Sequence, residues 1–271
     1  MLADSLADHE FAVYGEHPGM VCRVYRGQAK MLMGFPGSGA RLVNDAVTHA
    51  SRQNNAHDLA WALGVAGHVF QLLHEPQTTL RFASKAIEIA RDNRLPQWLA
   101  LGERCKGWAM FRLGEREAGL KLQRDGIRRW YETGAALHTT QCEIILAESF
   151  LRDHQISLAR SHLETAREHR TRYSEEYLAA EIDRLKALLL HSESAPAGIV
   201  EEYLGNSLSI ALRQEARLLE LRAATNLARI LIGKNERGKA ADLIAPVYNW
   251  FTEGFDTADL EEAKSLLDQL A

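Results

Sequence analysis

The stretch LELRAATNLARILIGKNERGKAADLIAPVYNW, residues 219–250, consists of two amphipathic segments joined by a polar turn at Lys234 and Asn235. In each segment, apolar residues recur every three or four positions, the spacing that places them on one face of an α-helix. The first stripe comprises Leu221, Ala224, Leu227, Ala228 and Leu231, and the second comprises Ala240, Leu243, Ile244 and Val247. The stretch therefore predicts a helical hairpin.

The same hairpin recurs along the chain with a period of about 40 residues. A small residue marks the first helix of each copy: Gly27, Gly67, Gly107, Ala147, Ala187 and Ala228. A second series follows about 20 residues later: Ala46, Ala86, Gly126, Ala166, Ser207 and Val247. Small side chains let paired helices approach to the short end of the usual separation of about 8–10 Å. Since glycine costs a helix interior roughly 1 kcal/mol relative to alanine, three glycines at one repeat position indicate a packing requirement.

The repeats account for nearly the whole length of 271 residues. We expect an N-terminal lead or cap over residues 1–16, six hairpins over 17–254 and a C-terminal capping helix over 255–271, in one continuous domain. No apolar alternation with period two is sustained, which argues against a sheet. The expected fold is all-α, a tetratricopeptide-like right-handed superhelix, or α-solenoid. The tetratricopeptide repeat has about 34 residues, so these longer units imply longer helices.

Composition and charge exclude several classes of protein. Hydrophobic residues make up 46% of the chain and charged residues 25%, which is ordinary for a soluble globular protein. The net charge of −4 provides no global attraction for nucleic acid or an anionic membrane. No stretch approaches the roughly 20 apolar residues of a membrane span, and the first ten residues lack the apolar core of a secretory signal. We therefore expect a cytoplasmic protein that binds neither nucleic acid nor membrane.

Motifs for catalysis, cofactors and metals are absent from the sequence. The glycine-rich run GFPGSG, residues 34–39, lacks the lysine of a phosphate-binding loop and is interpreted as a turn between helices. No H-E-x-x-H or G-x-S-x-G motif occurs. Cys22, Cys105 and Cys142 lie far apart without CxxC spacing, so we expect all three to be small buried apolar residues. The sequence predicts a protein that is not an enzyme and has no cofactor or metal.

Residues 219–270 resemble the C-terminus of a large bacterial family of multidomain regulators described as adenylate or guanylate cyclases or predicted ATPases. In that family, a cyclase or DNA-binding domain and a P-loop signalling ATPase precede a long tetratricopeptide-like region. The resemblance extends to residues 97–122 and 13–37, and so covers nearly the whole chain. It implies the repeat region without the catalytic domains, either free-standing or as a fragment, with a cyclase or ATPase domain as a partner.

General tetratricopeptide geometry places particular positions of each first helix on the concave face. These positions lie six and three residues before the small residue, and one, four and five residues after it. They select Trp61, His68, Arg104, Trp108, Phe111, Arg112, Glu148, Arg152, Arg222 and Arg229. Tryptophan and arginine are frequent at binding hot spots, so these residues are the predicted groove. The alternative is that Trp61 and Trp108 fill gaps between neighbouring repeats.

The sequence leaves three functions open. The leading hypothesis is a non-catalytic interaction or sensor module in bacterial signalling, whose concave groove binds a peptide segment or a partner domain. The alternative is a regulatory module for a small-molecule effector, in which the ligand changes the curvature of the superhelix. A further alternative is a fragment of a cyclase or ATPase regulator whose catalytic domains are missing here.

Overall fold

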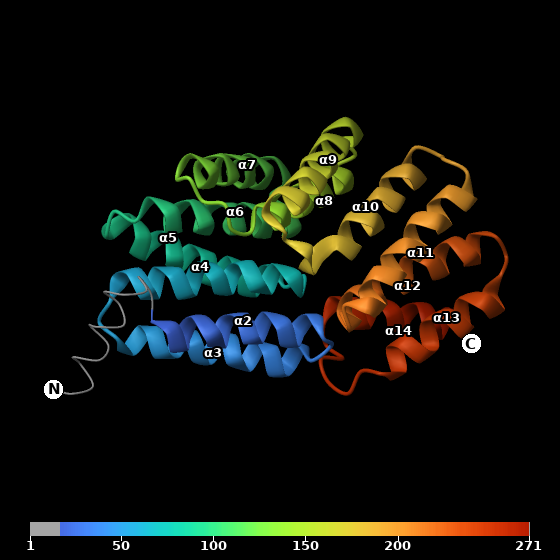
Figure 1. Ribbon diagram of the computed structural model, residues 1–271, viewed down its shortest axis with the longest axis horizontal. Coiled ribbons are helices and arrows are strands. Elements are labelled where there is room, and N and C mark those ends of the chain that lie inside the picture. Colours follow the sequence, from blue (N-terminus) through green and yellow to red (C-terminus); the bar gives the residue numbers. More distant parts are fainter. Residues whose placement is uncertain (1–16, 271) are drawn as a thin grey trace. The chain divides into compact units, whose positions relative to one another are not determined.

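The computed structural model describes residues 17–270 as a series of α-helices with one short 3₁₀ helix, and this part contains no strand (Figure 1). The expectation of an all-α fold is confirmed. The lead or cap expected over residues 1–16 lies outside the described residues. The helices are α2 (Pro18–Leu32), α3 (Pro36–Arg52), α4 (Ala56–Leu72), α5 (Pro76–Asp92), α6 (Pro96–Arg112), α7 (Arg116–Glu132), α8 (Thr139–Arg152), α9 (Ile156–Tyr173), η1 (Glu176–Leu178), α10 (Ala179–Ser192), α11 (Ala197–Arg213), α12 (Arg217–Gly233), α13 (Arg237–Asn249) and α14 (Ala258–Leu270).

Consecutive helices pack as pairs, namely α4 with α5, α6 with α7, α8 with α9, α10 with α11 and α12 with α13. Each of the helices α3 to α7 has 17 residues, and turns of three residues join α4, α5, α6 and α7. These lengths account for the period read from the sequence and confirm that the helices are long. The first helix of each pair carries the small residue of the repeat, for example Gly107 in α6 and Ala228 in α12.

Two local signals set where the helices begin and end. Prolines are the first residues of α2, α3, α5 and α6, where the fixed φ suits a helix and the missing N–H costs nothing. Many helices end with a residue of positive φ, such as His74 at 54° after α4. The amide of Glu75 then donates to the carbonyl of Phe70, and that of His74 donates to Gln71. This pair of bonds is the Schellman motif, which satisfies carbonyls that the helix end would leave unpaired.

Contacts between the helices divide the described chain into two compact units. The first comprises residues 17–31 and 36–134, and the second comprises residues 32–35 and 135–270. In the second unit, α14 packs on α12 and α13. Leu260, Ala263 and Leu266 of α14 are buried in one cluster with Leu221 and Ile244. The last hairpin thereby removes its apolar side from water, which is the main source of stability at the end of a helical array.

The cysteines differ in exposure. Cys105 and Cys142 are buried, as expected from the sequence, whereas Cys22 is exposed and that part of the prediction is wrong. Cys22 lies on α2 about half a turn away from the face that buries Met20, Val24 and Met31. Burial raises the pKa of the Cys105 thiol to about 11, against the opposing effect of the Arg104 charge.

We expect iodoacetamide at pH 8 to alkylate Cys22 alone in the folded protein, because the reactive species is an accessible thiolate. Intact-mass spectrometry should show one adduct in native buffer and three in urea. Rapid addition of a second adduct under native conditions would contradict the burial of Cys105 and Cys142.

Candidate functional site

The predicted groove residues of the first unit are almost fully buried. His68 of α4 is 0% exposed, while Arg104 and Trp108 of α6 are 2% and 1% exposed. Trp61 and Phe111 are also buried, and Arg112 is half-buried. Side chains with so little exposure offer no surface to a peptide, so their role is to be found in the contacts that they make.

These contacts join α4, α6 and α7 into one aromatic and basic cluster. Nη2 of Arg104 lies 3.1 Å from Nδ1 of His68, and its guanidinium lies 5.3 Å from the centre of the Trp130 ring. The guanidinium of Arg112 lies 5.4 Å from the centre of the Trp108 ring. Cation–π contacts of this kind are stronger where water is excluded. In this arrangement the cluster fills the space between neighbouring hairpins.

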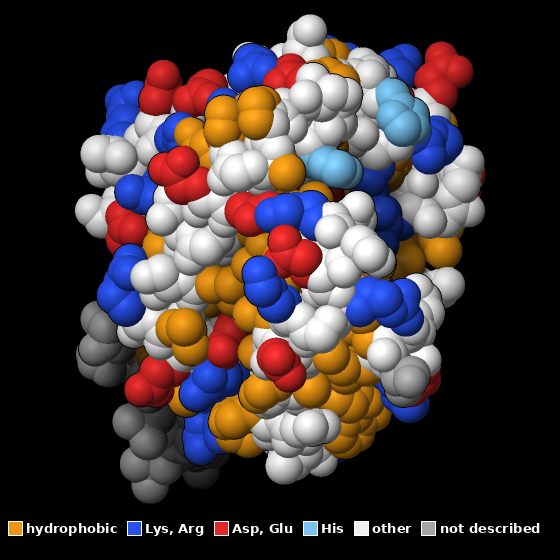
Figure 2. Space-filling view, turned by 90° about the vertical axis from the view of Figure 1, so that its right-hand side faces the viewer, with side chains coloured by type: hydrophobic (Ala, Val, Ile, Leu, Met, Phe, Trp, Pro, Cys, Tyr) orange, Lys and Arg blue, Asp and Glu red, His pale blue; other side chains and the backbone are white. Residues whose placement is uncertain are grey.

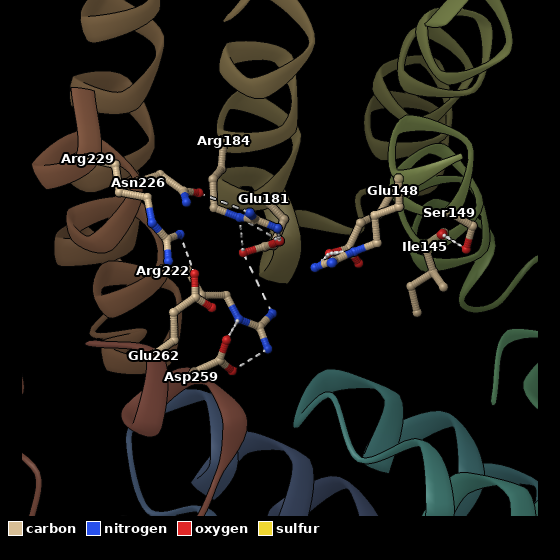
Figure 3. Close-up of polar contacts among 11 residues, drawn as sticks. Ile145, Glu148, Ser149, Glu181, Arg184, Arg222, Asn226, Arg229, Asp259 and Glu262 are labelled. Carbon is tan, nitrogen blue, oxygen red and sulfur yellow. Dashed lines mark hydrogen bonds and ion pairs between the residues drawn. The ribbon is translucent and has the colours of Figure 1, made fainter. Parts of the chain in front are cut away.

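The second unit gathers its predicted residues into a row of charges along the first helices of three hairpins (Figure 3). At its centre, Arg222 of α12 binds Asp259 of α14 through two bonds, from Nε to Oδ1 at 3.0 Å and from Nη2 to Oδ2 at 2.7 Å. Nη1 of Arg222 lies 3.7 Å from Oε1 of Glu181 on α10. Each of these three side chains is 5% exposed. The paired geometry is the one in which arginine binds carboxylates most strongly.

The row continues on both sides of this centre. Arg184 of α10 donates to Glu181 at 2.7 Å and, through Nη1, to Oδ1 of Asn226 at 3.1 Å. On α8, Arg152 donates to Glu148 at 3.1 Å. On α12, Arg229 pairs with Glu262 of α14. We call this set the arginine–carboxylate row; it consists of Glu148, Arg152, Glu181, Arg184, Arg222, Asn226, Arg229, Asp259 and Glu262.

Exposure changes along the row. The side chains of Arg152 and Arg229 are 48% and 46% exposed, whereas those of Arg184 and Arg222 are 7% and 5% exposed. Buried pairs thus form the middle of the row, and accessible guanidinium groups lie on α8 and α12.

Both buried arginines keep their charge. Burial opposes the charged form of Arg222, but the carboxylates of Asp259 and Glu181 outweigh it and raise the pKa of the guanidinium. For Arg184, burial is likewise the largest single effect, and the Glu181 carboxylate more than compensates, so its pKa is also raised. Neither side chain titrates in a physiological range, so the row is a fixed set of donors and acceptors rather than a pH switch.

Sequence reasoning found Glu148, Arg152, Arg222 and Arg229 but missed the α10 pair. The rule that selected Arg222 from Ala228 also selects residues six and three before Ala187, which are Glu181 and Arg184. The signal was therefore present in the repeat register. Asn226, Asp259 and Glu262 lie outside that register, and nothing in the sequence pattern marks them.

Residues 17–270 contain neither grouped metal ligands nor a membrane-spanning helix, and one face of this part carries mixed charge. On the face seen in Figure 2, acidic and basic side chains are interspersed, without the broad basic region that binds a nucleic-acid backbone. Within residues 17–270, no three His, Cys, Asp or Glu side chains are grouped to hold a metal ion. The helices in this range are all too short or too polar to span a membrane.

Comparison with known proteins identifies the fold. The sequence matches no protein-family model, and a search of curated proteins likewise finds no match. Among solved structures, the chain is similar to a Rap protein complexed with competence and sporulation factor, with a TM-score of 0.62 and 12% identity over 97% of this chain and 78% of that one. It is also similar to NprR in complex with its cognate peptide NprX, with a TM-score of 0.59 and 13% identity over 99% of this chain and 76% of NprR.

A third similar structure is a signal transduction ATPase with numerous domains (STAND) from Pyrococcus horikoshii, which has a tetratricopeptide repeat sensor. Its TM-score is 0.54 at 11% identity, and the match covers 93% of this chain but 38% of the ATPase. At such identities the likeness concerns the fold alone. The chain is an all-helical, tetratricopeptide-like repeat protein.

Proposed function

We propose that this chain is a non-catalytic regulatory module that binds an extended peptide segment at the arginine–carboxylate row. The observation that carries the proposal is the row itself, in which two half-exposed arginines, Arg152 and Arg229, adjoin a rigid buried network on the first helices of neighbouring hairpins. The likeness to NprR, whose structure contains its cognate peptide, supports the same class of ligand.

The row contains the groups that an extended peptide requires. Arg152 and Arg229 can each exchange a carboxylate of this chain for a carboxylate or carbonyl of the ligand. Oδ1 of Asn226 accepts a hydrogen bond from Arg184, which fixes the orientation of the amide. Nδ2 makes no hydrogen bond to the described residues and can therefore donate to a ligand. Four arginines face four carboxylates, and a peptide with an acidic side chain therefore competes best for the accessible guanidinium groups.

The buried part of the row contributes orientation. Arg184 and Arg222 are held by two or more partners each and lose no side-chain freedom when a ligand arrives. Immobilising a flexible side chain on binding costs about 0.5–1.5 kcal/mol, which a preformed network avoids. The surface around Arg152 and Arg229 is therefore already ordered before a ligand binds.

Selection from a displayed library of random seven-residue peptides tests the proposal. We expect enrichment of peptides with an acidic residue, and a fluorescein-labelled synthetic copy of a selected peptide should bind saturably in an anisotropy titration. Replacing Arg152 and Arg229 together by glutamine should weaken binding at least tenfold, since each charge-assisted bond contributes about 1.5–3 kcal/mol and tenfold is about 1.4 kcal/mol.

The matched control is the pair Arg160→Gln and Lys239→Gln, which removes the same charge from α9 and α13 of the same unit. Both of these side chains pair with carboxylates and are well exposed, like the tested arginines. Control affinity should equal that of the unmodified chain. Failure to enrich any peptide, or an equal loss in the control, would contradict the proposal.

A second proposal concerns the partner. We infer that the module acts as the sensor of a signalling ATPase in the same polypeptide, because the STAND protein is similar over nearly all of this chain. Reading the genomic DNA upstream of Met1 tests it: an in-frame P-loop motif is expected. A stop codon in frame before any such motif would contradict the inference and leave the peptide-binding proposal unaffected.

A further inference from the structure

A cavity of about 600 Å³ lies in the first unit, between the first turns of α4 and α6 and the last turn of α7. Its volume falls within the range of about 300–1,000 Å³ that is usual for small-molecule sites. The lining consists of His57, Leu95, Pro96, Gln97, Trp98, Leu99, Arg129, Glu132 and Thr133. No residue of the arginine–carboxylate row takes part, so a site here would be separate from the proposed peptide surface.

One wall of the cavity is apolar and aromatic. Trp98 is 6% exposed, and its ring is fixed edge-on against His57, with centroids 5.4 Å apart, and near Trp130 at 6.3 Å. Leu95, which directly precedes α6, and Leu99 in the first turn of α6 extend this wall. The Trp98 ring is held on two sides and backs this wall rigidly, while Leu95 and Leu99 provide its accessible apolar surface, so an apolar group packs there at little entropic cost.

The cavity also contains a cation whose donors are in part unused. Nε of Arg129 lies 2.9 Å from Oε2 of Glu103, and this ion pair holds the base of the guanidinium. Neither terminal nitrogen of Arg129 makes a hydrogen bond to a described residue, and the side chain is 41% exposed. The guanidinium is therefore positioned with two donors for an acceptor in the cavity.

The acid of the lining, Glu132, lies at the exposed rim of the cavity. Oε1 of Glu132 pairs with Nη1 of Arg128 at 2.9 Å, and both of these side chains are more than half exposed. Because Glu132 is more than half exposed, water screens its charge, and with or without Arg128 it repels an anion at Arg129 only weakly. The combination of an apolar wall and a forked donor selects a ligand with one carboxylate beside an apolar group.

We propose that this cavity binds a small apolar carboxylate, with its apolar group against Leu95 and Leu99 and its carboxylate on the terminal nitrogens of Arg129. The ligand is a free small molecule of about the size of indole acetate. The site goes beyond the peptide-binding function and does not depend on it.

Calorimetric titration of the full chain with indole-3-acetate, 3-phenylpropionate and 4-methylpentanoate tests the proposal, and each acid is compared with its neutral alcohol. We expect saturable binding of at least one acid, at least tenfold weaker binding of the matching alcohol, and at least tenfold weaker binding of the acid to Arg129→Gln. Arg128→Gln, which removes the same charge one residue away and outside the lining, should bind as the unmodified chain does.

Three outcomes would overturn the site: no saturable binding of any acid, equal affinity for acid and alcohol, or an equal loss in Arg128→Gln. If Arg129→Gln loses its helical circular dichroism, Gln97→Trp provides the same test by filling the cavity from its rim, and binding should be lost. A peptide with a free C-terminal tryptophan serves as the last comparison. Tighter binding of that peptide than of indole-3-acetate would contradict the small-molecule ligand and indicate that the cavity binds the C-terminus of a peptide.

Discussion

Replacing Arg222 by alanine should lower the free energy of unfolding of the second unit by about 3–5 kcal/mol, the usual result of removing one partner from a buried ion pair. Arg222 neutralises both Asp259 and Glu181, and all three side chains are 5% exposed. Without the guanidinium, Asp259 loses two hydrogen bonds, at 3.0 Å and 2.7 Å, while its carboxylate stays largely buried. The expected loss therefore includes the cost of leaving carboxylates buried with less compensating charge, in addition to the strength of the original pair.

Urea unfolding followed by circular dichroism measures this effect. The matched control is Arg229→Ala in the same helix, whose pair with Glu262 is about half exposed. Exposed pairs contribute about 0–1 kcal/mol, so the control should unfold almost as the unmodified chain does. The double variant Arg222→Ala with Asp259→Ala should cost less than the two single changes added together, since either single change already removes the interaction between the two side chains. If Arg222→Ala lowers the free energy of unfolding no more than Arg229→Ala does, the buried ion pair between Arg222 and Asp259 is contradicted.

The contrast between Arg222 and Arg229 shows how far the sequence predicts the site. Both were selected by the repeat register, and both lie in the arginine–carboxylate row. The register gives the face of α12 on which a residue lies, because that follows from helical periodicity. It cannot give burial, which for Arg222 depends on Asp259, 37 residues further along in α14. In the first unit, the same register selected Arg104 and Trp108, which neighbouring helices bury.

The helix ends, too, are predicted from the sequence only in part. The sequence marks the turns through glycine at Gly34 and Gly114, where positive φ is expected. His74, Arg94 and Ser194 adopt the same conformation at 54°, 55° and 59° without any glycine. Such residues pay a modest conformational cost that the Schellman hydrogen bonds offset. Their regular recurrence follows from the repeat geometry, and residue type alone would not have identified them.

A second large effect is expected in the first unit, where Gly107→Ala should destabilise the protein by about 1–3 kcal/mol or more, the usual range for overpacking. A Cβ at position 107 would lie 2.2 Å from the backbone N of Gln123 and 2.7 Å from the carbonyl O of Gly119. These atoms belong to the backbone of α7 and cannot rotate away, so α6 and α7 would have to separate. The strain should exceed the roughly 1 kcal/mol that alanine gains over glycine in a helix.

Gly67 occupies the same position of the previous repeat and provides the control. A Cβ there would have its nearest neighbour at 3.6 Å, which is ordinary van der Waals contact. Gly67→Ala should therefore raise stability by about 0.4–1 kcal/mol, because alanine restricts the unfolded chain without strain in the folded one. Urea midpoints of the two variants should move in opposite directions. Shifts of the same sign would contradict the close approach of α6 and α7. Opposite shifts would show that the close packing of the two helices requires glycine at position 107 but not at position 67, although the sequence pattern treats the two positions alike.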